Sequence, residues 1–197
     1  MTDTIFKVVS LVSAPQFTPA YFFIVIFFAI GGTNYTALYI PILFAMAVPL
    51  FMLAAFVRRS KQSIFVRDRS KRYPLFYTVA VSYAAGFVVL RYMNAQSIIT
   101  VLMLAYFLNL ILAMLVNRYV NKVSIHVWGI SGPAVAVLYV LGPFAFFLTI
   151  ALAALVGLCR VGTGDHTMEE VEIAIAVPIL LTYLVIFVVP MVFPGIA

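Results

Sequence analysis

Charged side chains are confined to a few short segments of this chain, and long uncharged runs separate them. Of the 18 charged residues, eight lie between positions 58 and 72 and five lie between positions 160 and 172. A helix needs about 20 apolar residues to cross the hydrocarbon core of a bilayer, and the uncharged runs are of this order. The remaining charges are Arg118 and Lys122, which form a third polar segment, and the isolated Asp3, Lys7 and Arg91.

The composition excludes the main soluble classes. The 197 residues are 65% hydrophobic and 9% charged, whereas soluble domains carry about 25% charged residues. A soluble fold of this composition would lack the polar side chains that cover a surface in water, and the chain is too apolar to stay disordered. We therefore expect an all-α fold, a polytopic transmembrane bundle of six or seven helices, in a single domain over residues 1–197. Such a chain is an integral, multi-pass protein of the cell membrane.

The apolar runs predict where the helices lie. Residues 5–15 are mildly amphipathic and too short to span, so we expect an interfacial segment there. The run at 17–30 is also short for a crossing, and the two glycines that follow it predict a turn. The N-terminus lacks a basic region followed by a continuous apolar stretch, so no cleaved signal peptide is expected. Further crossings are expected at 37–57, 75–90, 98–116 and 170–192, the last interrupted by Pro178 and ended by Pro190 and Pro194.

The uncharged run at residues 127–158 predicts a helical hairpin. Its 32 residues would extend about 48 Å as one helix, well beyond a hydrocarbon core of about 30 Å. Gly142 and Pro143 lie near the middle and are suited to reversing the chain, which leaves arms of about 14–16 residues and an open end recessed below the membrane surface. The hairpin returns the chain to the side that it left. The three polar segments and both histidines therefore share one face.

The charges on this face also predict its orientation. Only Arg91 lies clearly on the opposite side. The positive-inside rule therefore places the shared face in the cytoplasm. The residues that decide this are Arg58, Arg59, Lys61, Arg118 and Lys122.

The two histidines lie at the two ends of the predicted hairpin. If the last helix starts near residue 167, Glu170 lies one turn beyond His166 on the same face. A carboxylate there can accept a hydrogen bond from one imidazole nitrogen and leave the other as a nucleophile or base. Arg160 begins a tight turn that contains Gly162 and Gly164. The backbone N–H groups of this turn are predicted to point inward as an anion-binding nest.

The residue types gathered on this face suit a phosphoryl group. Its transition state spreads negative charge over three oxygens, and guanidinium groups stabilise that charge through paired hydrogen bonds. No acidic cluster accompanies them, so we expect a mechanism without a metal or a cofactor. The candidate catalytic residues are His166, His126 and Glu170. The candidate phosphate-binding residues are Arg160, Arg72, Arg69 and Ser124, with Arg67, Lys71 and Gly164 as additional candidates.

Three stretches resemble the motifs of a known family, the type 2 phosphatidic acid phosphatases, which are membrane lipid phosphatases related to vanadium haloperoxidases. Residues 159–170 resemble the third motif, SRxxxxxHxxxD, with Cys for Ser and Glu for Asp. Residues 124–126 resemble the second motif, PSGH, without its proline and glycine. Arg72 and Pro74 resemble the end of the first motif, KxxxxxxRP, with Phe65 at the lysine position and Arg69 or Arg67 as the substitute charge. The resemblance covers residues 67–185, with the motifs in the same order.

The resemblance implies a phosphohistidine mechanism on a lipid phosphate. His166 would attack phosphorus while Glu170 orients its ring. His126 would protonate the leaving group and then activate water, and the arginines and Ser124 would hold the phosphate oxygens. Residues 1–57 would be N-terminal helices and residues 58–197 the catalytic part. The partners would be the bilayer and a polyprenyl phosphate or diphosphate or a phosphatidate-like lipid, with no nucleic acid.

Two other interpretations of the same residues stay open. The basic cavity could serve a non-enzymatic anion or lipid-phosphate transporter, although broken helices with sites near the midplane are more typical of transport. Two histidines could ligate haem, but these two lie at helix ends and not at mid-helix positions. Lys122 and Trp128 are interpreted as ordinary interfacial residues, and Asp165 as an acid that offsets a helix dipole.

Overall fold

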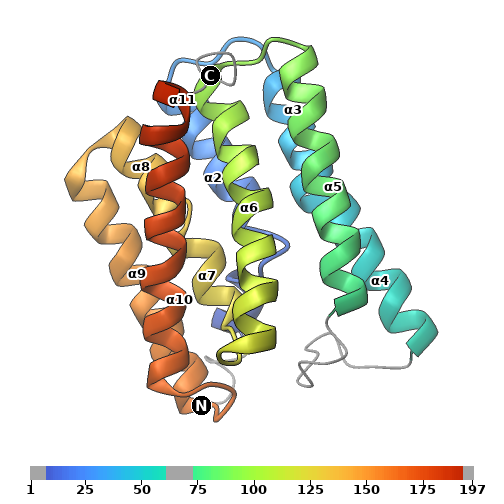
Figure 1. Ribbon diagram of the computed structural model, residues 1–197, viewed down its shortest axis with the longest axis vertical. Helices are drawn as coiled ribbons and strands as arrows, with labels where there is room; N and C mark the ends of the chain where they lie inside the picture. The colour runs from blue at the N-terminus through green and yellow to red at the C-terminus, as the bar shows by residue number, and fades with distance from the viewer. Residues whose placement is uncertain (1–7, 61–72, 193–197) are drawn as a thin grey trace.

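The computed structural model describes residues 8–60 and 73–192, and the regular structure in these residues is helical throughout (Figure 1). The described residues contain five helices that are long and apolar enough to cross a membrane, instead of the expected six or seven. The all-α class is therefore confirmed, and the apolar helices are those of a membrane protein. The five are Thr36–Arg59, Tyr73–Tyr92, Ser97–Tyr119, Pro143–Gly162 and Met168–Val192; the apolar segments Thr18–Ala29 and Ile125–Leu141 are shorter.

The N-terminal part contains two short helical segments and one long helix. Residues 8–12 are helical, and α2 (Thr18–Ala29) follows with 12 residues. At about 1.5 Å per residue, α2 is shorter than a bilayer core, as the sequence predicts. Gly31 has a φ of 66° and turns the chain after it. The long helix that follows consists of α3 (Thr36–Ile42), the π-helical segment η1 (Leu43–Ala47) and α4 (Val48–Ser60).

The rest of the chain forms an antiparallel pair and a set of helices that carry the candidate site. The pair is α5 (Tyr73–Tyr92) and α6 (Ser97–Tyr119). The predicted chain reversal is confirmed, because one helix ends at Leu141, the next begins at Pro143, and Gly142 between them has a φ of 85°. The remaining elements are α7 (Ile125–Ser131), α8 (Ala134–Leu141), α9 (Pro143–Gly162), α10 (Met168–Tyr183), the π-helical segment η3 (Leu184–Val188) and α11 (Val189–Val192).

The hairpin differs from the prediction in the lengths of its arms, whereas the last helix ends at Val192, as predicted. The first arm is itself divided into α7 and α8, because Pro133 between them lacks the N–H that would continue the helix. The second arm, α9, has 20 residues and reaches Gly162, because the helix accommodates the buried Arg160 in its last turn. The last helix continues through Pro190 to Val192. Prolines are tolerated inside apolar spanning helices when neighbouring groups satisfy the freed carbonyls.

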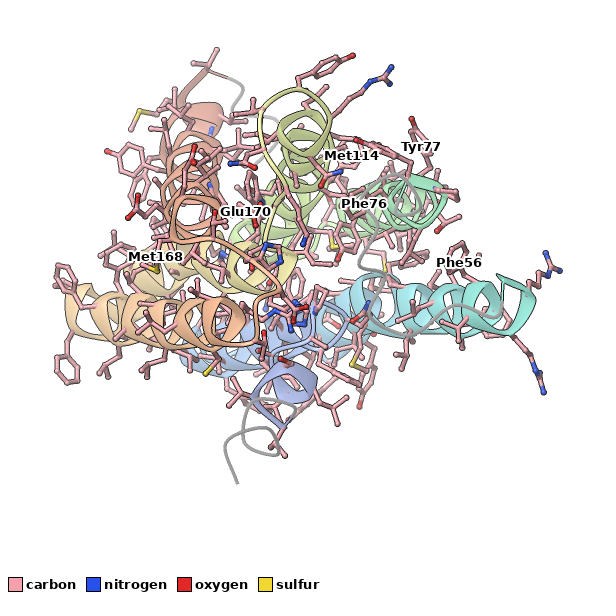
Figure 2. All side chains as sticks on the ribbon, turned by 90° about the horizontal axis from the view of Figure 1, so that it is seen from below. Phe56, Phe76, Tyr77, Met114, Met168 and Glu170 are labelled. Atoms are coloured by element: carbon pink, nitrogen blue, oxygen red, sulfur yellow. The ribbon has the colours of Figure 1, made fainter. Side chains whose placement is uncertain are left out.

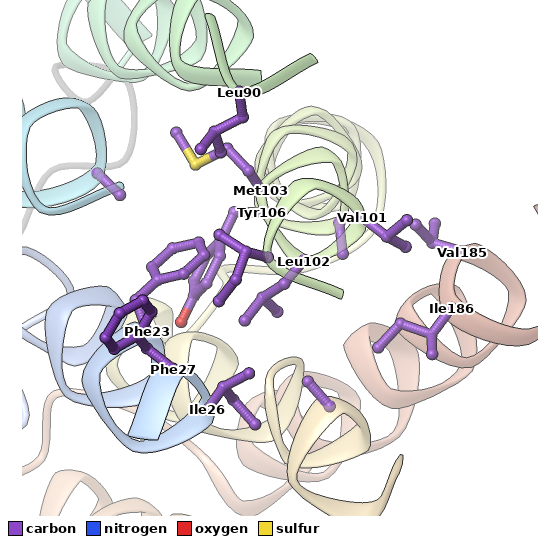
Figure 3. Packing of buried hydrophobic residues seen from close by; sticks show 14 of the residues in the cluster. Phe23, Ile26, Phe27, Leu90, Val101, Leu102, Met103, Tyr106, Val185 and Ile186 are labelled. Atoms are coloured by element: carbon purple, nitrogen blue, oxygen red, sulfur yellow. The ribbon is translucent and has the colours of Figure 1, made fainter. Parts of the chain in front are cut away.

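A core of large apolar side chains fixes α2 against α6. Phe23 and Phe27 of α2 are fully buried and lie on the side of α2 that faces Met103 and Tyr106 of α6 (Figure 3). The ring centroids of Phe23 and Tyr106 lie 5.6 Å apart. The short N-terminal helix is therefore held by packing against the spanning helix that leads toward the candidate site.

The helix ends that carry charge lie together at one end of the molecule. The end of α4, the end of α6, the start of α7 and the α9–α10 turn all lie at the lower end in Figure 1. Arg58, Arg118, Lys122 and Arg160 belong to these helix ends or adjoin them, whereas Arg91 ends α5 at the opposite end. The predicted convergence of polar segments on one face is confirmed for the described residues.

Gly157 allows α9 and α10 to approach each other closely. A Cβ added at position 157 would overlap Cγ1 of Val171, which is buried on α10. Arg160 lies one turn after Gly157, and Glu170 directly precedes Val171. The close approach at this glycine therefore sets the spacing between the two helices that carry the candidate site.

Candidate functional site

The candidate site centres on His166, in the turn between α9 and α10. Its Nδ1 lies 2.6 Å from Oε2 of Glu170, and both side chains are buried. Thr167 is the N-cap of α10 and forms a capping box with Glu170. In that box the Thr167 hydroxyl accepts from the Glu170 N–H at 3.2 Å, and the Thr167 N–H donates to Glu170 Oε2 at 3.3 Å. The predicted relation, with Glu170 one turn beyond His166, is confirmed.

Glu170 points inward because of its place in the first turn of α10. Seen from the end of the molecule that carries the site, it lies nearer the middle than Met168, which lies at the periphery (Figure 2). Met168 is 46% exposed, whereas Glu170 is 8% exposed. One carboxylate oxygen thus accepts hydrogen bonds both from the helix N-terminus and from the imidazole.

The surroundings of His166 favour its neutral form. Burial lowers the pKa of His166 from 6.5 to about 4, with further lowering by the positive charges of Lys122 and Arg160, while the hydrogen bond and charge of Glu170 oppose the shift. At neutral pH the ring is therefore uncharged. Its Nδ1–H donates to the Glu170 carboxylate, which leaves the lone pair on Nε2 available for attack.

Arg160 is buried and held by groups from two other parts of the chain. Its Nη1 donates to Oγ of Ser10 at 2.9 Å, and its Nη2 lies 3.2 Å from Oδ2 of Asp165. Thr163 also donates to Oδ2 of Asp165, at 2.9 Å. Asp165, interpreted from the sequence as an acid that offsets a helix dipole, also pairs through its carboxylate with Arg160. Sequence reasoning missed Ser10 because no pattern links it to a residue 150 positions away.

Lys122 belongs to the site and is not an ordinary interfacial charge. Its Nζ donates to the backbone carbonyl of Asp165 at 2.6 Å. Its charge contributes to the lowered pKa of His166. The two cations near His166 therefore come from α9 and from the segment between α6 and α7. The position of Lys122 four residues before His126 was the only sequence signal for this role.

The predicted anion-binding nest does not form. The N–H of Gly164 donates to the carbonyl of Val161 at 2.9 Å, and the N–H groups of Asp165 and His166 both donate to the carbonyl of Arg160. These donors satisfy the C-terminal carbonyls of α9 and are not directed at a ligand. Gly164 instead supplies the left-handed turn, with a φ of 70°.

Ser124 and His126, from the second predicted motif, lie on α7, which packs against the two helices of the site. Ser124 is the N-cap of α7 and His126 lies in its first turn, and both are buried. Because α7 packs against both α9 and α10, it lies beside the helices that hold Arg160 and Glu170. The Oγ of Ser124 is buried and has no hydrogen-bond partner among the described residues. A hydroxyl in this state is suited to bind a ligand oxygen.

The remaining predicted site residues are Arg67, Arg69, Lys71 and Arg72, and they lie outside the described residues. The same holds for Phe65 of the first motif. No group of three or more His, Cys, Asp or Glu side chains within residues 8–60 and 73–192 is arranged to hold a metal ion. The described site thus consists of His166, Glu170, Arg160, Lys122, Ser124 and His126.

The chemistry that this arrangement allows is that of an oriented, largely buried imidazole with two cations, Arg160 and Lys122, nearby. Such a ring can attack an electrophile that carries negative charge, because the neighbouring cations offset that charge. No protein-family model, no curated protein and no solved structure matches this chain. The similarity of residues 159–170 to the third phosphatase motif therefore stays a prediction from the sequence.

Proposed function

We propose that this protein is an integral membrane lipid phosphatase that hydrolyses the phosphomonoester or diphosphate of a lipid through a phosphohistidine intermediate. The observation that carries the proposal is the buried pair of His166 and Glu170, at 2.6 Å, beside the cations Arg160 and Lys122. A neutral, oriented imidazole needs an anionic electrophile to make use of those cations. A phosphoryl group has that charge and is attacked by histidine in known chemistry.

In the first step, Nε2 of His166 attacks phosphorus, the N–P bond forms, and the P–O bond to the lipid breaks. The ring becomes cationic as it attacks, and the Glu170 carboxylate stabilises that charge at Nδ1. The leaving oxygen takes a proton from the protonated His126. Arg160, Lys122 and the Ser124 hydroxyl are the groups of the described site that offset the charge on the phosphoryl oxygens.

In the second step, neutral His126 accepts a proton from water, and the resulting hydroxide attacks phosphorus. The N–P bond breaks, inorganic phosphate leaves, and both histidines return to their starting states. Water is the only co-reactant, so the balance needs no oxidant, metal or nucleotide.

The placement of the site supports a lipid substrate. The helix ends that carry it belong to helices long and apolar enough to cross a membrane. A phosphate on a lipid lies at the ends of such helices, where the headgroups meet water. The positive-inside distribution of the charged helix ends favours a site that opens on the cytoplasmic side.

The test is phosphate release by the purified protein in detergent with EDTA, from a panel that includes a polyprenyl phosphate, a polyprenyl diphosphate and a phosphatidate. We expect release from at least one, and a loss of at least about 100-fold in Glu170→Gln, the range that general acid–base and orienting groups contribute. Glu169→Gln is the matched control, since Glu169 is the exposed neighbour on the same turn. Saturable lipid-phosphate binding without release would favour a transporter and contradict the proposal.

The intermediate gives a second, independent measurement. With a lipid diphosphate labelled in its terminal phosphate, the leaving lipid phosphate needs no proton from His126, so we expect His126→Gln to retain label on the protein in a bond that acid cleaves and alkali does not. Label that is absent from the wild-type protein and from this variant during turnover would argue against covalent catalysis by His166.

A further inference from the structure

A second feature of the molecule is not used by the chemistry proposed above. It is a cavity of about 100 Å³ between α5, α6 and α7. One water molecule needs about 10–15 Å³ of such space, so the cavity has room for several heavy atoms. Its wall is largely apolar and includes Phe76, Val79, Leu102 and Ala113.

Three residues in the wall of this cavity carry buried polar atoms that lack partners. The hydroxyl of Tyr106, Oδ1 of Asn109 and Nε1 of Trp128 are buried and make no hydrogen bond to any described residue. Each side chain is more than nine-tenths buried. Leaving a buried polar group without a partner costs about 1–3 kcal/mol, so three of them around one space indicate a bound group that satisfies them. The sequence suggested that Trp128 is an interfacial anchor. Its burial in the wall of this cavity contradicts that interpretation.

The donor and acceptor types restrict what that group can be. Trp128 Nε1 only donates, and Asn109 Oδ1 only accepts. The orientation of the Asn109 amide is fixed, because its Nδ2 donates to the Ala105 carbonyl at 2.9 Å and to Thr182 Oγ1 at 2.7 Å. An ester or ether oxygen accepts but cannot donate, and a prenyl chain does neither. A hydroxyl group does both.

The position of the cavity relates it to the lipid phosphate. Its wall includes Ile125, the residue before His126, and extends along α7 to Gly132. Trp128 lies two residues beyond His126, and Gly132, which faces the Asn109 amide, lies six beyond it. At 1.5 Å per residue these positions are about 3 Å and 9 Å deeper than His126. The first few carbons after a phosphate reach this depth.

We infer that this cavity binds the segment of the substrate lipid next to its phosphate and selects lipids that carry a hydroxyl group there. The inference rests on the proposed function and adds its substrate class, the phosphomonoester of a hydroxylated alkyl lipid in place of a polyprenyl phosphate. Tyr106 and Asn109 are specificity residues in it, since they lie three apart on one face of α6. Trp128 completes the set from α7.

The first experiment compares two substrates that differ by one hydroxyl, dodecyl phosphate and 2-hydroxydodecyl phosphate. We expect kcat/KM for phosphate release to be about 3- to 10-fold higher for the hydroxylated lipid, the worth of one buried hydrogen bond. Tyr106→Phe and Trp128→Phe should each reduce this ratio. Tyr139→Phe is the matched control, because Tyr139 is exposed on α8, and it should keep the wild-type ratio. Equal kcat/KM for both lipids in the wild type would overturn the inference and leave the proposed function standing.

The second experiment does not depend on hydrolysis. Trp128 is the only tryptophan of the chain, so its fluorescence reports on the cavity. In the His166→Gln background, 2-hydroxydodecyl phosphate should change this fluorescence and bind more tightly than dodecyl phosphate, and adding Tyr106→Phe should weaken that preference. This result without phosphate release by the wild type would support the inference and reject the phosphatase. No fluorescence change with either lipid would overturn the inference.

Discussion

Replacing Gly157 by alanine should change the stability of the protein in opposite directions depending on the residue at position 171. In the natural chain, the new Cβ would overlap Cγ1 of Val171. Val171 cannot easily move aside, because a β-branched side chain in a helix has one strongly preferred rotamer. Overpacking costs about 1–3 kcal/mol, and we take the upper half of that range for a direct overlap. Alanine gains about 1 kcal/mol over glycine in helix propensity, which leaves a net loss of about 1–2 kcal/mol.

In the Val171→Ala background the same substitution should stabilise. Both Cγ atoms are then absent, and the next neighbour, Cγ2 of Val127 at 3.5 Å, is at ordinary contact distance. Only the gain in propensity remains, up to about 1 kcal/mol. Thermal unfolding of the four purified proteins in one detergent would measure this. For a chain of this size, 1 kcal/mol corresponds to about 2–4 °C in Tm, so Gly157→Ala should lower Tm by about 2–8 °C in the natural chain and raise it in the Val171→Ala background. A change of the same sign in both backgrounds would refute the close-approach argument.

Three further predictions concern charge and orientation. Lys122→Met removes a positive charge near His166, so the pKa of that ring should rise from about 4 toward 6.5. The acidic limb of the pH profile for phosphate release should then move to higher pH. An unchanged acidic limb would show that Lys122 does not act on His166. In the unfolded chain His166 has the ordinary histidine pKa of about 6.5, so the unfolded chain binds more protons than the folded protein between pH 6.5 and 4. The stability of the folded protein should therefore fall as the pH drops through this window. His166→Gln should show a smaller fall in Tm than the wild type. In a Cys159→Ala background, a membrane-impermeant thiol reagent on intact cells should label Tyr92→Cys and spare Arg58→Cys, while the reverse pattern would place the site outside the cell.

The sequence predicted those features that depend on local chemistry. The reversal at Gly142 followed from a glycine–proline pair in the middle of an overlong apolar run. The pairing of His166 with Glu170 followed from their spacing across a helix start, which is fixed by helix geometry. Both are confirmed because neither depends on where distant segments lie.

Other features depend on tertiary contacts or on competition for hydrogen bonds, and there the sequence was insufficient. Lys122 donates to the carbonyl of a residue 43 positions along the chain, and no local sequence pattern predicts a contact over that separation. The nest does not form because the carbonyls at the end of α9 accept hydrogen bonds from the same N–H groups. Trp128 was assigned to an interface by residue type alone, whereas packing places it in the wall of a cavity.

The shared oxygen of Glu170 has a consequence for how the site can fail. The oxygen that accepts from Nδ1 of His166 also accepts from the N–H of Thr167, which closes the first turn of α10. Unwinding that turn removes the partner of the ring at the same moment. His166 is therefore oriented for attack only while the first turn of α10 is helical. Fraying of this single helical turn would abolish the orientation of His166 without any movement of the other helices.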